Sequence, residues 1–390
     1  MKICIDARCL VEGRRTGVEE YTLGLLEELF SLDGKNEYIL FINSWKEPKF
    51  DFSAYSRFPN VKLRRLRIPN KILNFLFCYF DRPKIDRLVG GADIVFLPNI
   101  IFNAVGKKTK LVATIHDLSF ERYPEYFSEK RKWWHIFINP KKICRRADRI
   151  IAVSDSTQDD LLSLYGVPKE KIDLIHNAVS DKFRVIDRND ARLVKTKEKY
   201  GLPYKFILFL GTIEPRKNIA GLVRAYDALQ RYAVENKNEE LLKYKLVIAG
   251  ESGWKSKEIF SQIKKSPFRE NIKAISFVSD EDKEYLYNLS ALFVYPSFFE
   301  GFGFPPLEAM KCGIPVIASN NSSLPEVTLG AAVLIDPDKP DEIYRAMREV
   351  LLSGGLREKL IKKGLEKAKE FRWKKTAQDT LKVFQKSMPK

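Results

Sequence analysis

Short apolar segments rich in valine and isoleucine alternate with amphipathic segments along the whole chain. In the first half these segments are KICIDA, YILFIN, KLRRLRI, DIVFLP, KLVATIHD, RIIAVS and KIDLIHN. After a charged stretch the series restarts with FILFLGT, KLVIAGE, IKAISFV, ALFVYPS, PVIAS and AAVLID. Strands of this length separated by helices predict βαβ units with parallel sheets covered on both faces. Because the series occurs twice, we expect an α/β protein with two Rossmann-like domains.

The length of the chain and its charged middle stretch indicate where the two domains meet. A chain of 390 residues is long for one hydrophobic core, so two domains are favoured. We assign residues 1–180 to the first domain and residues 200–370 to the second. The last segment, 373–390, is amphipathic and begins at an apolar anchor, so we expect it to dock back on the first domain.

No apolar run in the sequence approaches the roughly 20 residues that a membrane-spanning helix needs. The first ten residues, MKICIDARCL, contain Asp6 and Arg8, which interrupt the apolar core that a signal peptide requires. We therefore expect a globular protein of the cytoplasm.

Cysteine and histidine usage favours neither a disulfide framework nor a metal centre. The five cysteines are odd in number and lack a C-x-x-C pair, so buried reduced thiols are expected. His116, His135 and His176 are scattered, and we expect a mechanism without metal or cofactor. The cysteines are Cys4, Cys9, Cys78, Cys144 and Cys312.

The formal charge of +17 is concentrated in two clusters, at residues 62–87 and 130–149. Both clusters interleave basic residues with large apolar or aromatic ones, a composition typical of surfaces that lie on anionic lipid headgroups. Solvated helix faces would explain the charge equally well. Nucleic acid is less favoured, because zinc-finger spacing, an RNP-type motif and a basic heptad region are all lacking.

Polar residues follow two of the expected strands in the first half. Thr16 and Gly17 precede an amphipathic helix, where exposed amides and the helix dipole favour an anion, although a simple loop glycine would look the same. His116 and Asp117 follow LVATI, so this imidazole is either a sugar or reaction-centre contact or a satisfied core histidine. His135 and His176 are interpreted as structural.

The second series opens with FILFLGTIEPRKN, in which Arg216 and Lys217 stand at the entry of a helix. Two adjacent cations beside a helix N-terminus suit a diphosphate better than a carboxylate, because the charge to be neutralised is about two. Random surface basicity is the alternative.

The segment FEGFGFPPLEAMKCG, residues 299–313, places two glutamates around a loop of glycine, phenylalanine and proline. We expect the preceding strand to end at Ser297, a helix to begin at the two prolines, and Glu308 to lie in its first turn. Helix capping would explain Glu308 but leaves Glu300 unexplained. Two carboxylates beside the exposed amides of Gly301 and Gly303 suit the hydroxyls and phosphates of a nucleotide sugar.

Taken in order, these motifs resemble the retaining glycosyltransferases of the GT-B fold, in the group called glycosyltransferase group 1 or family 4. The segment from Phe299 resembles the E-x7-E signature of that family. The likeness also includes TGVEEYT, HDLSFERYPEYF, RADRIIAVSDSTQDDL, LVIAGESG and FVSDEDKEYLY, and so covers nearly the whole chain. Bacterial mannosyltransferase-like enzymes of polysaccharide assembly are the nearest members. The resemblance implies two Rossmann-like domains facing each other across a cleft, with the acceptor on the first and the nucleotide sugar on the second.

Carried over position by position, the resemblance implies that Arg216 and Lys217 bind the donor diphosphate. Glu300 would hold hydroxyls of the donor sugar, and Glu308 would accept from the nucleotide ribose. In this family the first loop often carries a double glycine, whereas RRTGV has Gly17 alone, which weakens the expected grip on phosphate. The remaining implied contacts are Gly301, Phe302 and Gly303 with sugar and phosphate, Gly17 with diphosphate, His116 with the donor sugar or reacting centre, and Val278 and Ser279 with the base.

The reaction implied is metal-independent transfer of a hexosyl group, with retained configuration, from a GDP- or UDP-type sugar to a glycan or lipid-linked acceptor. Glu300 would position the sugar, with a covalent nucleophile as the alternative. An epimerase or phosphorylase of the same fold, or a non-catalytic nucleotide-sugar scaffold, are the rival functions. A lipid-linked acceptor would place the protein at the inner face of the membrane.

Overall fold

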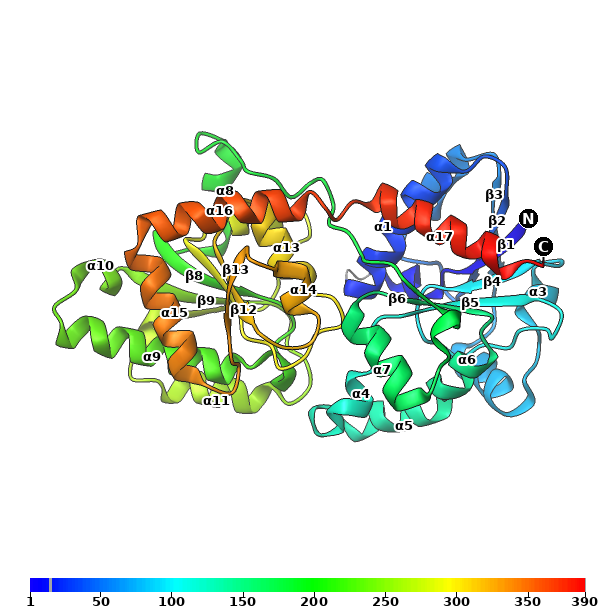
Figure 1. Ribbon diagram of the computed structural model, residues 1–390, viewed down its shortest axis with the longest axis horizontal. Coiled ribbons are helices and arrows are strands. Elements are labelled where there is room, and N and C mark those ends of the chain that lie inside the picture. The colour runs from blue at the N-terminus through cyan, green and yellow to red at the C-terminus, as the bar shows by residue number, and fades with distance from the viewer. Residues whose placement is uncertain (14–15, 390) are drawn as a thin grey trace. The chain divides into compact units, whose positions relative to one another are not determined.

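The computed structural model describes residues 1–13 and 16–389, which form two compact units (Figure 1). The N-terminal unit comprises Met1–Pro124, Glu129–Ala178 and the chain from Arg372 onward. The C-terminal unit comprises Glu125–Ser128 and Val179–Phe371. Each unit contains a parallel sheet of its own.

The N-terminal unit is built on a seven-stranded sheet with the order β3-β2-β1-β4-β5-β6-β7, in which every pairing is parallel. Its central strands are buried on both faces, as their near-continuous apolar sequences require. The strands are β1 (Lys2–Asp6), β2 (Glu37–Asn43), β3 (Val61–Leu66), β4 (Ile94–Leu97), β5 (Lys110–Ile115), β6 (Arg149–Ala152) and β7 (Ile172–Leu174).

Helices connect these strands, and one further helix comes from the end of the chain. A π-helical turn, η3 (Leu76–Phe80), continues directly from α2. The helices are α1 (Gly17–Leu32), α2 (Asn70–Phe75), α3 (Ile85–Leu88), α4 (Ser119–Arg122), α5 (Glu129–Ile138), α6 (Pro140–Arg146), α7 (Asp155–Tyr165) and α17 (Trp373–Ser387).

The C-terminal unit has a six-stranded parallel sheet with the order β10-β9-β8-β11-β12-β13. Starting from β8, the chain places β9 and β10 on one side and β11, β12 and β13 on the other side. This is the doubly wound Rossmann order. The strands are β8 (Lys205–Leu210), β9 (Tyr244–Ala249), β10 (Ile272–Ile275), β11 (Leu292–Tyr295), β12 (Val316–Ser319) and β13 (Ala332–Ile335).

Helices cover both faces of this second sheet, so its apolar side chains are enclosed (Figure 1). The helices are α8 (Ala191–Tyr200), α9 (Ile219–Glu235), α10 (Glu239–Leu242), α11 (Ser256–Lys265), α12 (Lys283–Leu289), α13 (Phe304–Lys311), α14 (Leu324–Thr328), α15 (Pro340–Leu352) and α16 (Gly354–Ala368). Two Rossmann-like parallel sheets in one α/β chain confirm the predicted fold class. All five cysteines are free thiols; Cys4, Cys144 and Cys312 are buried as expected, whereas Cys9 and Cys78 are only partly buried.

One predicted boundary in the second sheet is wrong. β11 ends at Tyr295, before the expected Ser297. Pro296 follows Tyr295 and has no N–H to donate to a neighbouring strand, so it ends the pairing. Ser297 is thereby released into the loop, where its hydroxyl takes part in the site described below.

The last helix, α17, packs in the N-terminal unit, where an aromatic anchor fixes its start. The Trp373 ring lies 6.1 Å from the Tyr21 ring of α1, between centroids. A Cβ built on Gly24 of α1 would come within 2.2 Å of the Trp373 indole. Further along, Phe384 packs edge-on against Phe96 of β4, at 5.2 Å between ring centroids. Glycine at position 24 is therefore what lets the indole reach the α1 backbone.

We expect Gly24→Ala to destabilise the protein by about 1–3 kcal/mol, because the new methyl group overlaps the partly buried indole of Trp373. Helix propensity alone would make alanine more stable than glycine by about 1 kcal/mol, so the predicted loss of stability is opposite in sign to the effect of propensity. Gly355→Ala in α16 is the matched control, since nothing lies within 4 Å of its added Cβ. Urea unfolding of both variants provides the measurement, and equal or greater stability for Gly24→Ala would contradict the packing.

Candidate functional site

The predicted donor residues of the C-terminal unit gather where the strand order reverses. β8 and β11 are paired neighbours, and the chain leaves them toward opposite edges of the sheet. In open α/β sheets, ligands bind beyond the carboxyl ends of the strands at this switch point. The loop after β8 carries Arg216 and Lys217, and the loop after β11 carries Glu300. The two loops are joined by a hydrogen bond of 2.8 Å from the Phe298 amide to the Arg216 carbonyl.

Glu300 and Lys217 form a buried ion pair between these loops. Lys217 Nζ donates to Glu300 Oε1 at 2.6 Å and to the Tyr295 hydroxyl at 2.7 Å. Glu300 Oε1 also accepts from Ser297 Oγ at 2.5 Å. Lys217 and Glu300 are each only 7% exposed, so the pair is largely removed from water. The side chains expected to meet phosphate and sugar are therefore in contact with each other.

Arg216 adds a second cation to the same cluster. Its guanidinium lies 3.2 Å from Glu300 Oε2 and 2.9 Å from Glu214 Oε1, and it donates to the Phe299 carbonyl. Glu214 is 2% exposed and stands just before the 3-10 turn η6 (Pro215–Lys217). Two cations and two carboxylates thus form one compact group, a neutralising arrangement that the sequence analysis did not foresee.

Electrostatics keep Glu300 ionised despite its burial. Burial by itself raises the pKa of Glu300, but the charges of Arg216 and Lys217 outweigh that effect and bring its pKa to about 2. Burial lowers the pKa of Lys217, and Arg216 lowers it further, while Glu300 opposes both. An additional anion beside Lys217 would favour its charged form.

The glycine loop between β11 and α13 is held by two serines that follow β12. The Glu300 amide donates to Ser322 Oγ at 3.0 Å. Ser323 Oγ contacts the Glu300 and Phe302 carbonyls at 2.9 and 2.7 Å. Gly303 has φ +106°, and a Cβ there would meet the Leu324 side chain at 2.7 Å, so glycine is required. The loop containing Gly301, Phe302 and Gly303 is consequently fixed in shape.

Glu308 lies one turn deeper in α13 than predicted. The helix begins at Phe304, so Glu308 is in its second turn, and the expectation of a first-turn position is wrong. Helix capping therefore does not explain Glu308 either. The Tyr287 hydroxyl donates to Glu308 Oε2 at 2.8 Å, and burial raises the pKa of Glu308. At 8% exposure this carboxylate is held by one oxygen only among the described side chains.

The residues predicted to contact the nucleotide base, Val278 and Ser279, lie in the loop between β10 and α12. Val278 is buried. The Ser279 amide donates to the Tyr200 hydroxyl at 3.2 Å, and Ser279 Oγ donates to Asp282 Oδ2 at 2.6 Å. The polar groups of Ser279 thus support the loop itself.

Two buried polar atoms beside the glycine loop have no hydrogen-bond partner among the described atoms. These are Ser319 Oγ, at the end of β12, and Asn321 Oδ1. A buried polar atom without a partner costs about 1–3 kcal/mol unless water or a ligand satisfies it. Both atoms can accept a hydrogen bond from water or from a ligand.

Gly17 and His116, the predicted N-terminal site residues, belong to the other unit. Gly17 is the first residue of α1, after Thr16, whose amide donates to Glu19 Oε2 at 3.1 Å. His116 follows β5, and its Nε2 lies 2.9 Å from the Pro98 carbonyl. A carbonyl only accepts, so Nε2 carries the proton and Nδ1 is left as an acceptor. Burial lowers the pKa of His116, which favours this neutral form.

His135 and His176, which the sequence analysis interpreted as structural, both belong to the N-terminal unit. The His135 ring stacks on Phe120 at 3.9 Å between centroids and lines a cavity of about 420 Å³ with Lys132 and Lys141. The His176 carbonyl accepts from Thr376 of α17 at 2.9 Å.

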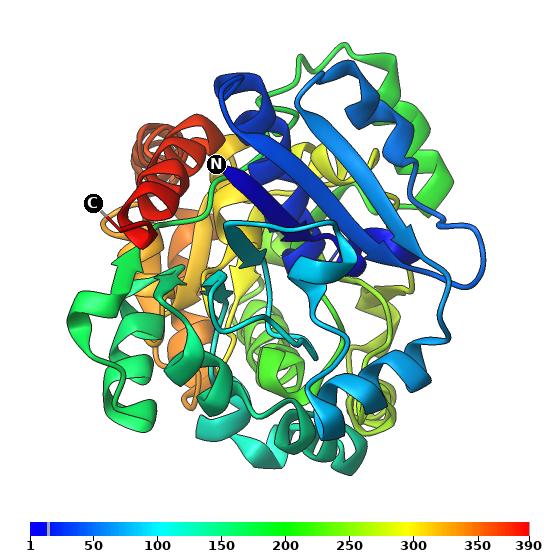
Figure 2. The same cartoon turned by 90° about the vertical axis from the view of Figure 1, so that its right-hand side faces the viewer.

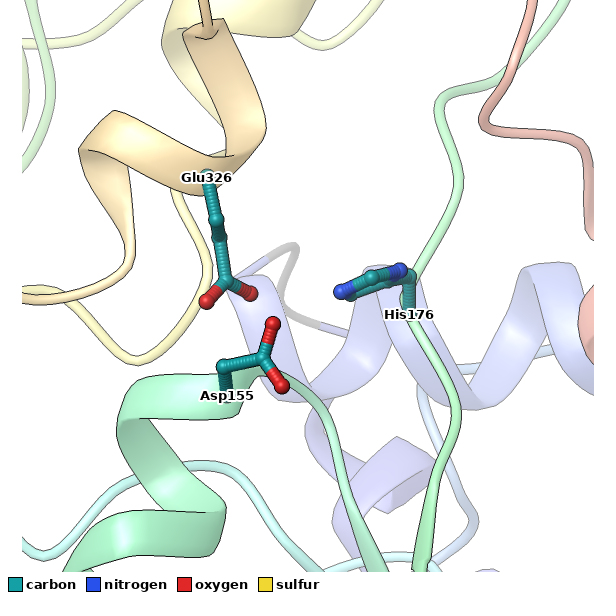
Figure 3. Close-up of side chains that lie close together, drawn as sticks. All are labelled: Asp155, His176 and Glu326. Carbon is teal, nitrogen blue, oxygen red and sulfur yellow. The ribbon is translucent and has the colours of Figure 1, made fainter.

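Figure 3 shows Asp155, the first residue of α7, and His176, which follows β7, with ligand atoms within 4.8 Å of each other. Zinc sites in proteins use three or four such ligands, so these two residues alone do not complete a zinc site. Glu326, also drawn, belongs to α14 of the C-terminal unit and is not counted with them.

None of the described helices is both long enough and apolar enough to cross a membrane.

Several residues of the candidate site were missed by sequence reasoning. The glutamate of the EPRK segment could have been noticed as a third carboxylate beside two cations. The hydroxyl groups had no comparable sequence signature, because serine and tyrosine are common at strand ends. The missed residues are Glu214, Tyr287, Tyr295, Ser297, Ser322 and Ser323.

The fold and site define an α/β protein of the nucleotide-binding type, with ionisable groups at the switch point of its second sheet. The family model described as Glycosyltransferase Family 4 matches residues 15–183, and that described as Glycosyl transferases group 1 matches residues 194–367. The chain therefore belongs to the group 1 and family 4 glycosyltransferases, and the resemblance inferred from its motifs is confirmed.

Its relatives include the O-antigen chain mannosyltransferase B of Escherichia coli, which is 34% identical over 70% of each chain. The serotype-specific mannosyltransferase WbdA of Escherichia coli is 33% identical over 70% of this chain. That match spans 33% of the longer WbdA protein. Both relatives are mannosyltransferases, in accord with the mannosyltransferase-like character expected from the sequence.

Solved structures share the GT-B fold at low sequence identity. Sucrose-phosphate synthase from Thermosynechococcus elongatus is 19% identical, with a TM-score of 0.74 over 99% of this chain and 98% of its own. Anabaena HepE in complex with UDP-glucose is 17% identical, with a TM-score of 0.71 over 99% and 100%. WaaG, a glycosyltransferase of lipopolysaccharide biosynthesis, is 13% identical, with a TM-score of 0.69 over 98% of each chain. At these identities the likeness establishes the fold alone.

We expect Glu300→Gln to destabilise the protein by about 2–4 kcal/mol at pH 7, since two buried cations lose a counter-charge. In the wild type the pKa of Glu300 in the folded protein, about 2, lies below the ordinary glutamate value of 4.5. Ionised Glu300 therefore contributes to the free energy of unfolding above about pH 4.5, and this contribution is lost as the pH falls toward 2. The stability difference between wild type and variant should shrink over that window.

Urea midpoints measured from pH 7 down to the limit of folding provide the test. Glu270→Gln, at an exposed glutamate, is the control and should track the wild type throughout. A Glu300→Gln difference that stays constant between pH 5 and 3 would contradict the ionised cluster.

Proposed function

We propose that this glycosyltransferase moves a hexosyl group, a mannosyl group in the first instance, from a nucleotide-diphosphate sugar to an acceptor hydroxyl with retention of configuration. Mannose is supported by the names of the two Escherichia coli relatives. A nucleotide-diphosphate donor is supported by HepE, which binds UDP-glucose in a similar fold. Assembly of a bacterial polysaccharide or glycolipid is the proposed setting, with a glycan or lipid-linked acceptor.

The observation that carries the proposal is that each buried glutamate has one oxygen with a single contact or none. Glu300 Oε1 accepts from Lys217 and Ser297, while Oε2 has only the Arg216 contact. Glu308 Oε2 accepts from Tyr287, and no contact is described for its Oε1. A carboxylate oxygen with remaining lone pairs, held rigidly near a strand end, is suited to a sugar or ribose hydroxyl. We assign Glu300 to the transferred sugar and Glu308 to the ribose.

The departing diphosphate is assigned to Arg216, Lys217 and the amides of Gly301, Phe302 and Gly303. An ammonium group has three N–H donors, of which Tyr295 and Glu300 occupy two, leaving one for a phosphate oxygen. Pro305 and Pro306 remove two amides from the first turn of α13, so the loop amides supply the donors there. These cations stabilise the developing charge without a metal in this proposal.

Glu300 is assigned a positioning role in preference to covalent attack. Two cations and a hydroxyl group stabilise its negative charge and hold its pKa at about 2, which makes the carboxylate a weak nucleophile. In the N-terminal unit, His116 Nδ1 is proposed to accept from a substrate hydroxyl and the Gly17 amide to donate to phosphate. Val278 and Ser279 are proposed to lie against the base.

The transfer itself is tested with GDP-mannose and UDP-glucose as donors and a mannose-terminated oligosaccharide as acceptor. An α-linked product from an α-linked donor, established by NMR of the anomeric carbon, supports retention. An undiminished rate in excess EDTA supports metal independence. Failure to turn over or hydrolyse any nucleotide sugar would favour a non-catalytic scaffold. Epimerisation of the nucleotide sugar would favour the sugar-nucleotide epimerase, and phosphate-dependent cleavage would favour the phosphorylase.

The roles proposed for Lys217 and Glu308 predict that their variants differ in the binding of GDP and of pyrophosphate. Lys217→Ala should weaken binding of both GDP and inorganic pyrophosphate by about 2–4 kcal/mol, as expected for a lost charge-assisted contact. Glu308→Gln should weaken GDP but leave pyrophosphate unchanged, because only the ribose contact is altered. Lys265→Ala, at an exposed lysine of α11, is the control.

Isothermal titration calorimetry of the three variants measures these affinities, after their unfolding temperatures confirm that each is folded. Unchanged diphosphate affinity in Lys217→Ala would overturn the phosphate assignment. An equal loss of GDP and pyrophosphate binding in Glu308→Gln would overturn the ribose assignment.

A further inference from the structure

The two basic clusters of the sequence expose large apolar side chains in the N-terminal unit. Tyr79 and Ile136 are each 62% exposed, and Trp133 is 58% exposed. Single exposed apolar residues are common, but a group of this size on adjoining segments marks an interaction surface. The exposed apolar residues of α2, η3 and α5 are Ile72, Phe75, Tyr79, Phe80, Trp133, Trp134, Ile136 and Phe137.

These side chains are exposed because the same segments bury a different face. Leu73 and Phe77 point into the core of the N-terminal unit, and Ile138 joins the same core cluster from α5. A helical segment whose core-facing side is already apolar needs no further apolar residues for folding. The outward aromatic residues are therefore not explained by the packing of the fold.

The segments adjoin, although Cys78 and Phe137, which connect them, are 59 positions apart in the sequence. The Cys78 thiol of η3 donates to the Phe137 carbonyl of α5 at 3.6 Å between sulfur and oxygen. In Figure 2, the blue helical segment after β3 lies beside the teal helix α5 at the lower edge. Together, residues 70–80 and 129–142 form one surface, here called the basic–aromatic surface.

The charge on this surface is strongly positive. Its two acidic residues are Asp81, at its edge, and Glu129, and each is paired locally, at 2.5 Å with Lys84 and at 2.7 Å with Lys132. The remaining exposed charged residues within it are basic, namely Lys71, Lys130, Arg131, Lys141 and Lys142, and Arg82 and Glu121 lie beside it. Such a surface is electrostatically complementary to an anionic partner.

Tryptophan, tyrosine and phenylalanine flanked by lysine and arginine match the boundary region of a bilayer, where rings enter the headgroup layer and cations meet lipid phosphates. A solvated face would need the charges but not the aromatic residues. Single-stranded nucleic acid would use aromatic rings for stacking, but Ile72 and Ile136 have no planar face to stack.

We propose that the basic–aromatic surface docks on an anionic lipid bilayer, with its aromatic and isoleucine side chains entering the headgroup region. This partner goes beyond the transfer reaction, because the surface contains none of the residues assigned to donor binding. The docking holds whichever sugar or nucleotide the enzyme uses.

Vesicle binding tests the proposal with the full chain. At low salt, the wild type should co-sediment with phosphatidylglycerol-containing vesicles and far less with pure phosphatidylcholine. Trp133→Ser combined with Phe137→Ser should reduce partitioning by at least about tenfold, from the lost burial of two aromatic side chains. Trp45→Ser, at a tryptophan that is 67% exposed elsewhere in the same unit, is the matched control and should bind normally.

Insertion is separated from simple charge attraction by tryptophan fluorescence. Lipids brominated near the headgroup should quench the wild type and Trp45→Phe equally, and quench the Trp133→Phe/Trp134→Phe variant markedly less. Lys141→Glu combined with Lys142→Glu should weaken binding through charge alone. All variants should keep the wild-type unfolding temperature and its shift with GDP, so that loss of docking is distinguishable from loss of the donor site.

Three results would overturn the proposal. The first is wild-type partitioning of the double serine variant. The second is equal binding to anionic and neutral vesicles. The third is tight, salt-sensitive binding of a single-stranded oligonucleotide without vesicle binding.

Discussion

The buried ion pair between Lys217 and Glu300 joins the loops that follow β8 and β11, the two central strands of the C-terminal unit. From these two strands the chain continues toward opposite edges of the sheet. It lies in a part of the sheet where an unpaired charge would cost several kcal/mol, so each partner requires the other. Arg216 and Glu214 extend the pair into a neutral group of four charges. The loops that carry these residues are further joined by a backbone hydrogen bond from Phe298 to Arg216, which makes the site rigid before any ligand binds.

That rigidity has a functional consequence. Glu300 is fixed by Lys217 and Ser297, and Glu308 by Tyr287, so the oxygens proposed for substrate hydroxyls need little reorganisation on binding. The same contacts that stabilise the unit orient the site. Its stability and its proposed binding geometry therefore depend on the same few polar side chains.

Much of the fold was predictable because it follows from local patterns. Each apolar segment named from the sequence became a strand, since a parallel sheet buried on both faces needs near-continuous apolar residues. The end of β11 was misplaced because the effect of Pro296 on pairing was overlooked. The position of Glu308 in α13 was predicted wrongly because the helix was expected to begin at the two prolines. The helix begins at Phe304, so Glu308 lies in its second turn. The segment Glu125–Ser128 lies in the C-terminal unit, a placement that no pattern in the sequence indicated.

The sequence by itself determined the alternation of strands and helices, the family, and the identities of the cations and carboxylates, because these depend on residue types and their spacing. Only the tertiary structure decided which of these groups are in contact. The pairing of Lys217 with Glu300, the hydroxyl support from Tyr287 and Ser297, and the union of two distant basic segments into one surface arise from strand order and helix packing. Such contacts join residues far apart in the chain, and residue spacing carries no information about them.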